Sequence, residues 1–376
     1  MNIGFDAKRI FQNYTGLGNY SRTLVGNLLK YCPEHRYLLF SSHVNRHPFN
    51  EVFHQSNNCQ IIGPPAGFPL KSWWRRRNLL KNSHFQNLSV FHGLTNEIPL
   101  GIEKTKIPTI VTIHDLIFKE YPHQYPPIDR FFYDQKSRKA CKEANRIIAI
   151  SEATKSDIVN YYQINPNKIS VIYQDCSPIF KIPPSEKDLQ WVCQQYDLPD
   201  TFMLYVGSVI ERKNLMTIVK ALTLLPKSLK IPLVVVGRGK AYEQKVKKFI
   251  HQHQLEKLVL WRNIPYNHLP ATYHLAQIFL YPSQKEGFGI PVIEALSIGT
   301  PVITSNTSSL KEAGGTAAYK IPPTDVDALS QGIELILTNN QLQTQMIAEG
   351  KIHVQKFHSQ KVNRELMNLY QEISKD

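Results

Sequence analysis

The chain has 376 residues, of which 42% are hydrophobic, and this length favours two domains because a single core stops growing at about 250–300 residues. The formal net charge of +14 indicates anionic partners without choosing among nucleic acid, lipid headgroups and phosphorylated metabolites. No apolar run approaches the ~20 residues that span a bilayer, and the first residues predict a strand and not a signal peptide, so we expect a cytoplasmic protein.

Short apolar runs alternate with amphipathic stretches, which is typical of βαβ units around parallel sheets. In the first half, the pattern predicts strands at residues 3–5, 37–40, 90–92, 109–113, 146–150 and 168–172, and helices at 20–31, 129–144 and 152–162. We therefore expect residues 1–178 to form a Rossmann-like domain. Ligands gather at the carboxyl ends of the strands in such sheets, so we look for functional side chains there.

A segment with two glycines follows the first predicted strand and leads into a helix. Gly16 and Gly18 resemble part of a dinucleotide-binding loop, but the full GxGxxG pattern is missing, which disfavours an NAD site. His114 and Asp115 end another buried strand, where catalytic groups of α/β sheets often lie. A single histidine is more often structural, so the residues alone leave both interpretations of His114 open.

The densest basic stretch places paired tryptophans beside arginines. Its residues are Trp73, Trp74, Arg75, Arg76 and Arg77. Such a mixture suits a membrane interface or a stacking surface. A helix with a solvated basic face and a buried tryptophan explains the same pattern, and both interpretations stay open at this point.

Three prolines in residues 177–184 make a continuous helix or strand improbable, and we interpret this segment as the interdomain linker. Strands are then predicted at 202–206, 233–236, 258–260, 278–281 and 302–304, with helices at 215–225, 241–253, 269–275 and 291–297. Residues 185–355 thus form a second Rossmann-like domain, and residues 356–376 form a C-terminal helix that we expect to pack back on the first domain. The predicted fold class is α/β, with two parallel-sheet domains facing a deep interdomain cleft.

Two adjacent cations follow the first strand of the second domain. That strand ends at Gly207, and Arg212 and Lys213 come five and six residues later. Lysine offers a compact charge and arginine a bidentate fork, so the pair suits a departing phosphate. Exposed Arg-Lys pairs before helices are also common, and the pair alone is weak evidence.

The most informative segment holds two carboxylates, Glu286 and Glu294, around a turn that leads into a short helix. Gly287 and Gly289 remove Cβ atoms where a ligand approaches the backbone, and Pro291 fits the first helical position, which would put Glu294 in the first turn. Free N–H groups at the helix start attract anions. The segment therefore suits a polyhydroxylated, phosphorylated ligand, although an ordinary helix start with favourable acids explains it too.

A metal site is not predicted. Asp325 and Asp327 match the acidic DxD pattern of some metal-dependent glycosyltransferases, but they follow two prolines and precede Ala-Leu, so helix capping explains them better. The five cysteines are odd in number and lack CxxC spacing, which indicates neither a zinc site nor a disulfide framework.

In combination, these motifs resemble the GT-B glycosyltransferases, specifically the retaining family 4, whose signature is the E-x7-E motif seen here as Glu286 and Glu294. The resemblance spans essentially the whole chain. It includes the segments at residues 16–18, 114–116, 150–152, 207–214, 236–237, 286–304 and 309–315.

The resemblance implies a nucleotide-diphospho-sugar donor that binds mainly to the second domain. Glu294 would hold ribose hydroxyls, and Glu286 would contact the transferred hexose. Lys213, helped by Arg212, would hold the leaving diphosphate, and His114 would lie near the sugar. Further donor contacts are implied for Gly16, Gly18, Ser208, Gly287, Phe288, Gly289 and Ile290. Enzymes of this type are thought to use front-face substitution without a metal or cofactor.

One departure from the family is Ser208, where many relatives carry arginine, so Arg212 would take more of the phosphate charge. The segments at residues 114–116 and 309–315 resemble bacterial mannosyltransferases of surface polysaccharides. This implies GDP-mannose as donor and a glycan or lipid-linked acceptor. On the membrane interpretation of residues 73–77, the protein would also contact anionic lipid at the inner face of the cell membrane, and we expect no nucleic acid partner. The alternatives are a GT-B nucleotide-sugar epimerase, or a basic membrane- or nucleic-acid-binding protein with a degenerate sugar site.

Overall fold

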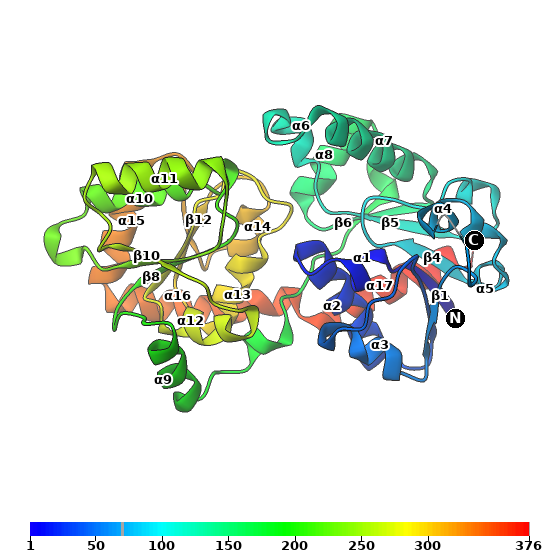
Figure 1. The fold of residues 1–376 in the computed structure, drawn as a ribbon, viewed down its shortest axis with the longest axis horizontal. Helices are drawn as coiled ribbons and strands as arrows, with labels where there is room; N and C mark the ends of the chain where they lie inside the picture. The colour runs from blue at the N-terminus through cyan, green and yellow to red at the C-terminus, as the bar shows by residue number, and fades with distance from the viewer. Residues whose placement is uncertain (69–70, 376) are drawn as a thin grey trace. The chain divides into compact units, whose positions relative to one another are not determined.

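The computed structural model describes residues 1–68 and 71–375 and divides the chain into two compact units (Figure 1). Unit 1 consists of Met1–Asp175 together with Phe357–Asp376, and unit 2 consists of Cys176–Lys356. Each unit is built on one sheet whose strands all pair in parallel. The prediction of two parallel-sheet α/β domains is therefore confirmed.

The sheet of unit 1 has seven strands in the order β3-β2-β1-β4-β5-β6-β7. The strands are β1 (Asn2–Asp6), β2 (Arg36–Phe40), β3 (Cys59–Ile62), β4 (Val90–Gly93), β5 (Thr109–Ile113), β6 (Arg146–Ala149) and β7 (Ile169–Val171). The order reverses between β1 and β4, so the carboxyl ends of these two neighbours open a crevice at which ligands of such sheets bind.

Helices cover both faces of this sheet. They are α1 (Lys8–Gln12), α2 (Gly16–Tyr31), α3 (Glu51–Gln55), α4 (Lys71–Arg76), α5 (Ser83–Gln86), α6 (Ile117–Glu120), α7 (Pro127–Glu143), α8 (Glu152–Tyr162) and α17 (Ser359–Ile373). In Figure 1, α2 and α17 lie on one face and α7 and α8 on the other. The C-terminal helix α17 packs against α2, which places the end of the chain in the first unit.

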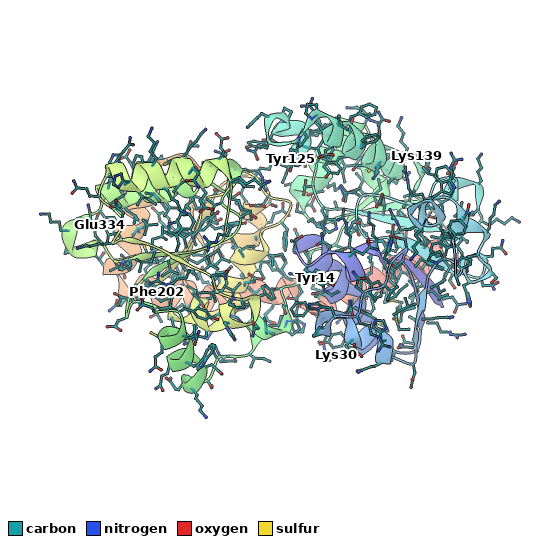
Figure 2. All side chains as sticks on the ribbon, in the orientation of Figure 1. Tyr14, Lys30, Tyr125, Lys139, Phe202 and Glu334 are labelled. Carbon is teal, nitrogen blue, oxygen red and sulfur yellow. The ribbon has the colours of Figure 1, made fainter. Side chains whose placement is uncertain are left out.

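The sheet of unit 2 has six strands in the order β10-β9-β8-β11-β12-β13. The strands are β8 (Met203–Val206), β9 (Leu233–Val236), β10 (Val259–Arg262), β11 (Ile278–Tyr281), β12 (Val302–Ser305) and β13 (Tyr319–Ile321). Its helices are α9 (Glu186–Gln195), α10 (Leu215–Leu224), α11 (Ala241–Gln252), α12 (Leu269–Leu275), α13 (Ile290–Ile298), α14 (Leu310–Gly314), α15 (Val326–Thr338) and α16 (Asn340–His353). Side chains fill the space between sheet and helices (Figure 2).

Several elements were missed by the sequence analysis because their apolar runs are short or only half buried. The edge strand β3 buries just Ile62 fully, and β13 has three residues. The helices α9 and α15 were missed although each begins with a capping signal. Ser185 and Asp188 form a capping box at α9, and at α15 the Asp325 side chain accepts from the Ala328 N–H at 2.9 Å. Asp325 therefore caps a helix, as its sequence context indicates.

The basic stretch at residues 73–77 does not form one continuous surface. Trp74 is buried in the core of unit 1, and Arg75 is only 7% exposed because it contacts Asp6 and Glu97. Trp73 is half exposed, with Arg77 over its ring at 4.8 Å. The buried Trp74 agrees with the interpretation of this stretch as a helix with a buried tryptophan, and membrane contact through residues 73–77 stays a prediction. Among the described residues, the helices are too short or too polar to cross a bilayer.

Candidate active site

The candidate site in unit 2 lies where the neighbouring strands β8 and β11 end. The loop after β8 turns at Gly207, whose backbone lies so close to Gly237 that a Cβ on Gly237 would come within 1.9 Å of the Gly207 carbonyl oxygen. The same loop continues to Arg212, whose carbonyl oxygen accepts from the Gln284 N–H at 2.8 Å and from the Ser283 hydroxyl at 3.1 Å. The loops after the two strands are thereby tied together.

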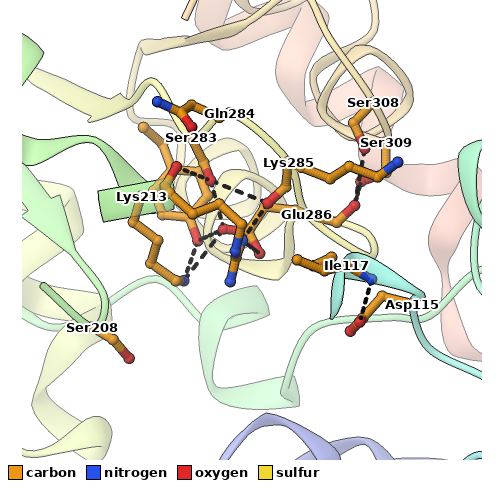
Figure 3. Close-up of polar contacts among 12 residues, drawn as sticks. Asp115, Ile117, Ser208, Lys213, Ser283, Gln284, Lys285, Glu286, Ser308 and Ser309 are labelled. Carbon is orange, nitrogen blue, oxygen red and sulfur yellow. Dashed lines mark hydrogen bonds and ion pairs between the residues drawn. The ribbon is translucent and has the colours of Figure 1, made fainter. Parts of the chain in front are cut away.

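Glu286 lies in the second of these two connected loops and contacts residues of both. Its carboxylate oxygens lie 3.0 Å from Arg212 Nη1 and 3.5 Å from Lys213 Nζ. The hydroxyls of Tyr281 and Ser283 also donate to the carboxylate, at 3.0 and 2.9 Å. Lys213 in turn donates to the Tyr281 hydroxyl at 2.5 Å, so the residues form one network (Figure 3).

The electrostatics of this network favour a charged Glu286. Burial alone raises the pKa of its carboxyl, but Lys213 and Arg212 outweigh burial, so the pKa falls to about 2. Two cations face one carboxylate, which leaves a local surplus of positive charge. A diphosphate entering the site could therefore compete with Glu286 for both cations.

The main chain of Glu286 is also fixed, because the Ser308 and Ser309 hydroxyls donate to its carbonyl oxygen at 3.0 and 2.7 Å (Figure 3). Helix α13 follows closely. It begins at Ile290, which places Pro291 at the second helical position and not the first. The N-cap, Gly289, has a φ of 123°, and a Cβ there would lie 2.8 Å from Leu310. Packing against α14 and backbone strain thus require Gly289 independently of any ligand.

The remaining predicted residues of this segment differ in exposure. Gly287 and Ile290 are partly exposed, whereas Phe288 is buried. Ser208 is exposed after β8, and its carbonyl oxygen accepts from the Tyr205 hydroxyl at 3.0 Å. The loop at Ser208 is therefore held through its backbone, and its side chain faces solvent.

Glu294 lies in the second turn of α13, a correction to its predicted place in the first turn. It is 4% exposed, and its two carboxylate oxygens accept from the hydroxyls of Tyr266 at 3.0 Å and Tyr273 at 3.3 Å. Burial raises the pKa of Glu294 to about 7, although both tyrosines oppose the shift. Each carboxylate oxygen has a second lone pair, so further hydroxyls can still be accepted.

The raised pKa of Glu294 predicts a pH-dependent stability. The native state binds the Glu294 proton more tightly than the unfolded chain does. Protonation of Glu294 therefore stabilises the native state fully below the unfolded pKa, and this stabilisation is lost as the pH rises through about 7. We expect wild type to lose about 3 kcal/mol of unfolding free energy relative to Glu294→Gln between about pH 4.5 and about pH 8. Urea denaturation of both proteins at the two pH values measures this difference.

The matched control for this experiment is Glu334→Gln on α15, because Glu334 is exposed (Figure 2). Its stability relative to wild type should change little between the two pH values. A Glu294→Gln difference that stays constant with pH would show that folding does not raise the pKa of Glu294.

In unit 1, the two predicted glycines belong to α2 and not to a loop before it. Gly16 is its first residue and Gly18 its third, since α1 takes up the chain between β1 and α2. The Asn13 side chain accepts from the Gly18 N–H at 3.1 Å. A Cβ on Gly18 would lie 1.8 Å from the Asn13 carbonyl oxygen, so this close approach requires glycine.

His114 follows β5 and is buried. Its Nε2 lies 2.9 Å from the Leu94 carbonyl oxygen, which can only accept, so Nε2 carries the proton. Burial lowers the pKa of His114 to about 4, so the ring is neutral at neutral pH and Nδ1 bears a lone pair. His114 also lines a cavity of about 260 Å³ within unit 1. Other residues around this cavity include Arg9, Leu17, Asn96, Glu97, Asp115, Tyr125 and Lys136.

A buried polar chain runs from the C-terminal helix to the vicinity of His114. The Tyr370 hydroxyl lies 2.6 Å from His92 Nδ1, and His92 Nε2 lies 2.8 Å from the Thr112 hydroxyl. Thr112 also contacts the Tyr20 hydroxyl at 3.1 Å, and the Tyr20 ring packs edge-on against His114 at 4.5 Å. Helices α17 and α2 are thereby connected to the end of β5.

The structure thus brings together Glu286, Arg212 and Lys213 in unit 2, and places His114, Gly16 and Gly18 in unit 1. Sequence analysis missed the tyrosines that hold the two glutamates. Tyr281 ends β11 directly before the E-x7-E segment, so its place at a strand end was the available signal. Tyr266 and Tyr273 lie far from that segment in sequence and gave no signal of their own.

Both halves of the chain match models of glycosyltransferase families. Residues 14–174 match the Glycosyltransferase Family 4 model, and residues 194–353 match the model described as Glycosyl transferases group 1. The two matches fall in unit 1 and unit 2, respectively.

Relatives and solved structures agree with these matches. The chain is 29% identical to O-antigen chain mannosyltransferase B of Escherichia coli over 75% of this chain and 74% of the relative. It is 27% identical to the serotype-specific mannosyltransferase WbdA of Escherichia coli, over 72% of this chain but only 34% of that longer protein. The crystal structure of Anabaena HepE in complex with UDP superposes with a TM-score of 0.76 at 16% identity, covering 99% of this chain and 100% of that one.

Proposed function

Because the chain is a GT-B glycosyltransferase with family 4 and group 1 domains, we propose that it transfers mannose, with retention, from GDP-mannose to a hydroxyl of a glycan or lipid-linked acceptor. The names of the two Escherichia coli relatives support the sugar and the pathway, since both are mannosyltransferases and one acts on the O-antigen chain. An acceptor of this kind would be reached at the inner face of the cell membrane. Because both relatives are named as transferases, they do not favour the alternative that this chain is a nucleotide-sugar epimerase.

The observation that carries the proposal is the position of Glu286 between Arg212 and Lys213, at 3.0 and 3.5 Å, beside the start of α13. Two cations and the helix N-terminus supply positive charge for a diphosphate without a metal. When phosphate oxygens take over the cations, the Glu286 carboxylate becomes available to the hexose hydroxyls. Ribose hydroxyls would donate to the remaining lone pairs of Glu294.

The reaction would then proceed at one face of the sugar. The bond between the anomeric carbon and the phosphate oxygen breaks, the acceptor oxygen bonds to that carbon from the same side, and the acceptor proton passes to the leaving phosphate. Arg212 and Lys213 stabilise the charge that develops on the phosphate. Neutral His114 offers Nδ1 as an acceptor for a sugar hydroxyl, and no protein base is needed.

A thermal-shift screen against GDP, UDP, ADP, dTDP and their sugar conjugates, with and without EDTA, tests the donor. We expect both GDP and GDP-mannose to stabilise the protein, each by about 2.7 kcal/mol when its concentration is a hundred times its Kd. For each ligand, this stabilisation should be the same with and without EDTA. Stabilisation by UDP in place of GDP would overturn the donor base, and loss of stabilisation in EDTA would overturn metal independence.

Product analysis separates transfer from the alternatives. Incubation with GDP-mannose and a mannose-terminated oligosaccharide should give an acceptor longer by one residue, with the anomeric configuration of the donor. A donor returned with altered sugar stereochemistry in the absence of acceptor would favour an epimerase. Stabilisation by none of the nucleotides would indicate a degenerate site.

A further inference from the structure

The first two turns of α7 expose an unusual group of large apolar side chains. Ile128 is 71% exposed, Phe131 59% and Phe132 54%. The second half of the helix behaves differently, since Ala140 and Cys141 pack into the core beneath it. The helix is therefore anchored at its C-terminal half and by the Tyr133 ring on Phe118, while Ile128, Phe131 and Phe132 present apolar surface to solvent.

A groove of about 260 Å³ lies beside these aromatic rings, with Arg76 of α4 and residues 97–100 also along it. Of the charged residues that line the groove among those described, four are cationic and one is acidic. The cations are Arg75, Arg76, Lys136 and Lys139, and the acid is Glu97. Glu97 contacts Arg75 at 2.9 Å and Lys136 at 3.6 Å. Two further carboxylates contact these cations, Asp6 at Arg75 and Glu143 at Lys139, so four cations meet three carboxylates and a surplus of one positive charge remains for a ligand.

We propose that this surface, named here the α7 face and made of Ile128, Phe131, Phe132, Arg76 and Lys139, docks unit 1 onto a bilayer that contains anionic lipid. The aromatic and aliphatic side chains would enter the boundary between headgroups and acyl chains, as they do in amphipathic interfacial helices. Arg76 and Lys139 would meet lipid phosphates, their aliphatic stems lying along the apolar surface.

Charge complementarity selects a membrane over a protein partner. The chain carries a formal net charge of +14, and cations border the exposed rings on both α4 and α7. Lys139, labelled in Figure 2, is 45% exposed and contacts Glu143 one turn along α7 at 2.6 Å, so a lipid phosphate would compete with that carboxylate. Of residues 73–77, the α7 face includes Arg76, whereas Trp74 and Arg75 are buried and lie outside it. The inference does not depend on which sugar is transferred.

Flotation of the full chain with phosphatidylcholine vesicles, with and without phosphatidylglycerol, tests the inference. We expect binding only with phosphatidylglycerol, weakened by high salt. The double variant Phe131→Ser, Phe132→Ser should lower the partition coefficient at least ~10-fold, because two apolar rings leave the interface. Arg76→Glu with Lys139→Glu should abolish the dependence on anionic lipid.

Matched controls come from exposed residues elsewhere. Phe49→Ser removes a ring that is 57% exposed, and Ile352→Ser removes an aliphatic side chain that is 73% exposed in unit 2. Both controls should bind vesicles like wild type, and all variants should keep the nucleotide-induced thermal shift. Vesicle binding that survives the double Phe variant would overturn the inference. A chain that ignores vesicles but forms a dimer broken by the same variant would also overturn it, in favour of a protein interface.

Discussion

Replacing Glu286 by alanine or glutamine, or Lys213 by alanine, should lower the rate of sugar transfer at least ~10²-fold. Positioned charges of this kind commonly contribute ~3 kcal/mol to the transition state. Glutamine keeps the size of Glu286 but removes the charge that Arg212 and Lys213 contact at 3.0 and 3.5 Å. Steady-state kinetics with saturating donor and acceptor measure the effect.

Two comparisons make this prediction specific. Glu211→Gln and Lys220→Ala change exposed residues of the same chain region and should leave turnover within a factor of two or so of wild type. The double variant Glu286→Gln, Lys213→Ala should lose less than the product of the single losses, because the two side chains act in one network. Near-normal turnover in both single variants would contradict the assignment of this site.

The sequence predicted which of these residues would lie together because the signal for each of them is local. Glu286, the glycines beside it and the start of α13 lie within nine residues, and Arg212 and Lys213 lie in the loop after the buried strand β8. Parallel strands bring their carboxyl ends to one edge, so short motifs at those ends converge without further information. The two sheets were predicted for the same reason, since each central strand is a short continuous apolar run.

The features that could not be predicted from the sequence depend on contacts between residues that are distant in the chain. Tyr266 and Tyr273 reach Glu294 from another helical region, and His92 reaches Tyr370 across 278 positions of sequence. Asn13 explains Gly18 by a close approach of backbone atoms that no spacing rule reveals. Similarly, Arg75 and Arg76 look equivalent in the sequence, and only the fold shows that Arg75 points inward and Arg76 outward.

This difference between the two arginines predicts opposite results for the same substitution. Arg75 bridges Asp6 at the end of β1 and Glu97, and Arg75 and Asp6 are 7% and 5% exposed. Arg75→Ala leaves the buried Asp6 carboxylate without its cation, which typically costs about 3–5 kcal/mol, whereas Glu97 keeps Lys136 at 3.6 Å. Arg76→Ala removes an exposed side chain and should change stability by less than about 0.5 kcal/mol.

Hydrogen–deuterium exchange of the β1 and β4 amides measures this effect within unit 1 alone. A loss of about 3 kcal/mol speeds exchange at least ~10²-fold in Arg75→Ala, while Arg76→Ala should exchange like wild type. The double variant Asp6→Asn, Arg75→Met separates charge from packing, because replacing buried ionic partners together is often neutral or stabilising. If the double variant recovers part of the lost stability, the uncompensated charge caused that part of the loss. Equal exchange rates in Arg75→Ala and Arg76→Ala would instead show that the contacts of Arg75 with Asp6 and Glu97 do not stabilise unit 1. The same reasoning means that changing Arg75, Arg76 and Arg77 together to glutamate would destabilise unit 1 through Arg75, so a loss of vesicle binding in that variant would not by itself identify a membrane contact.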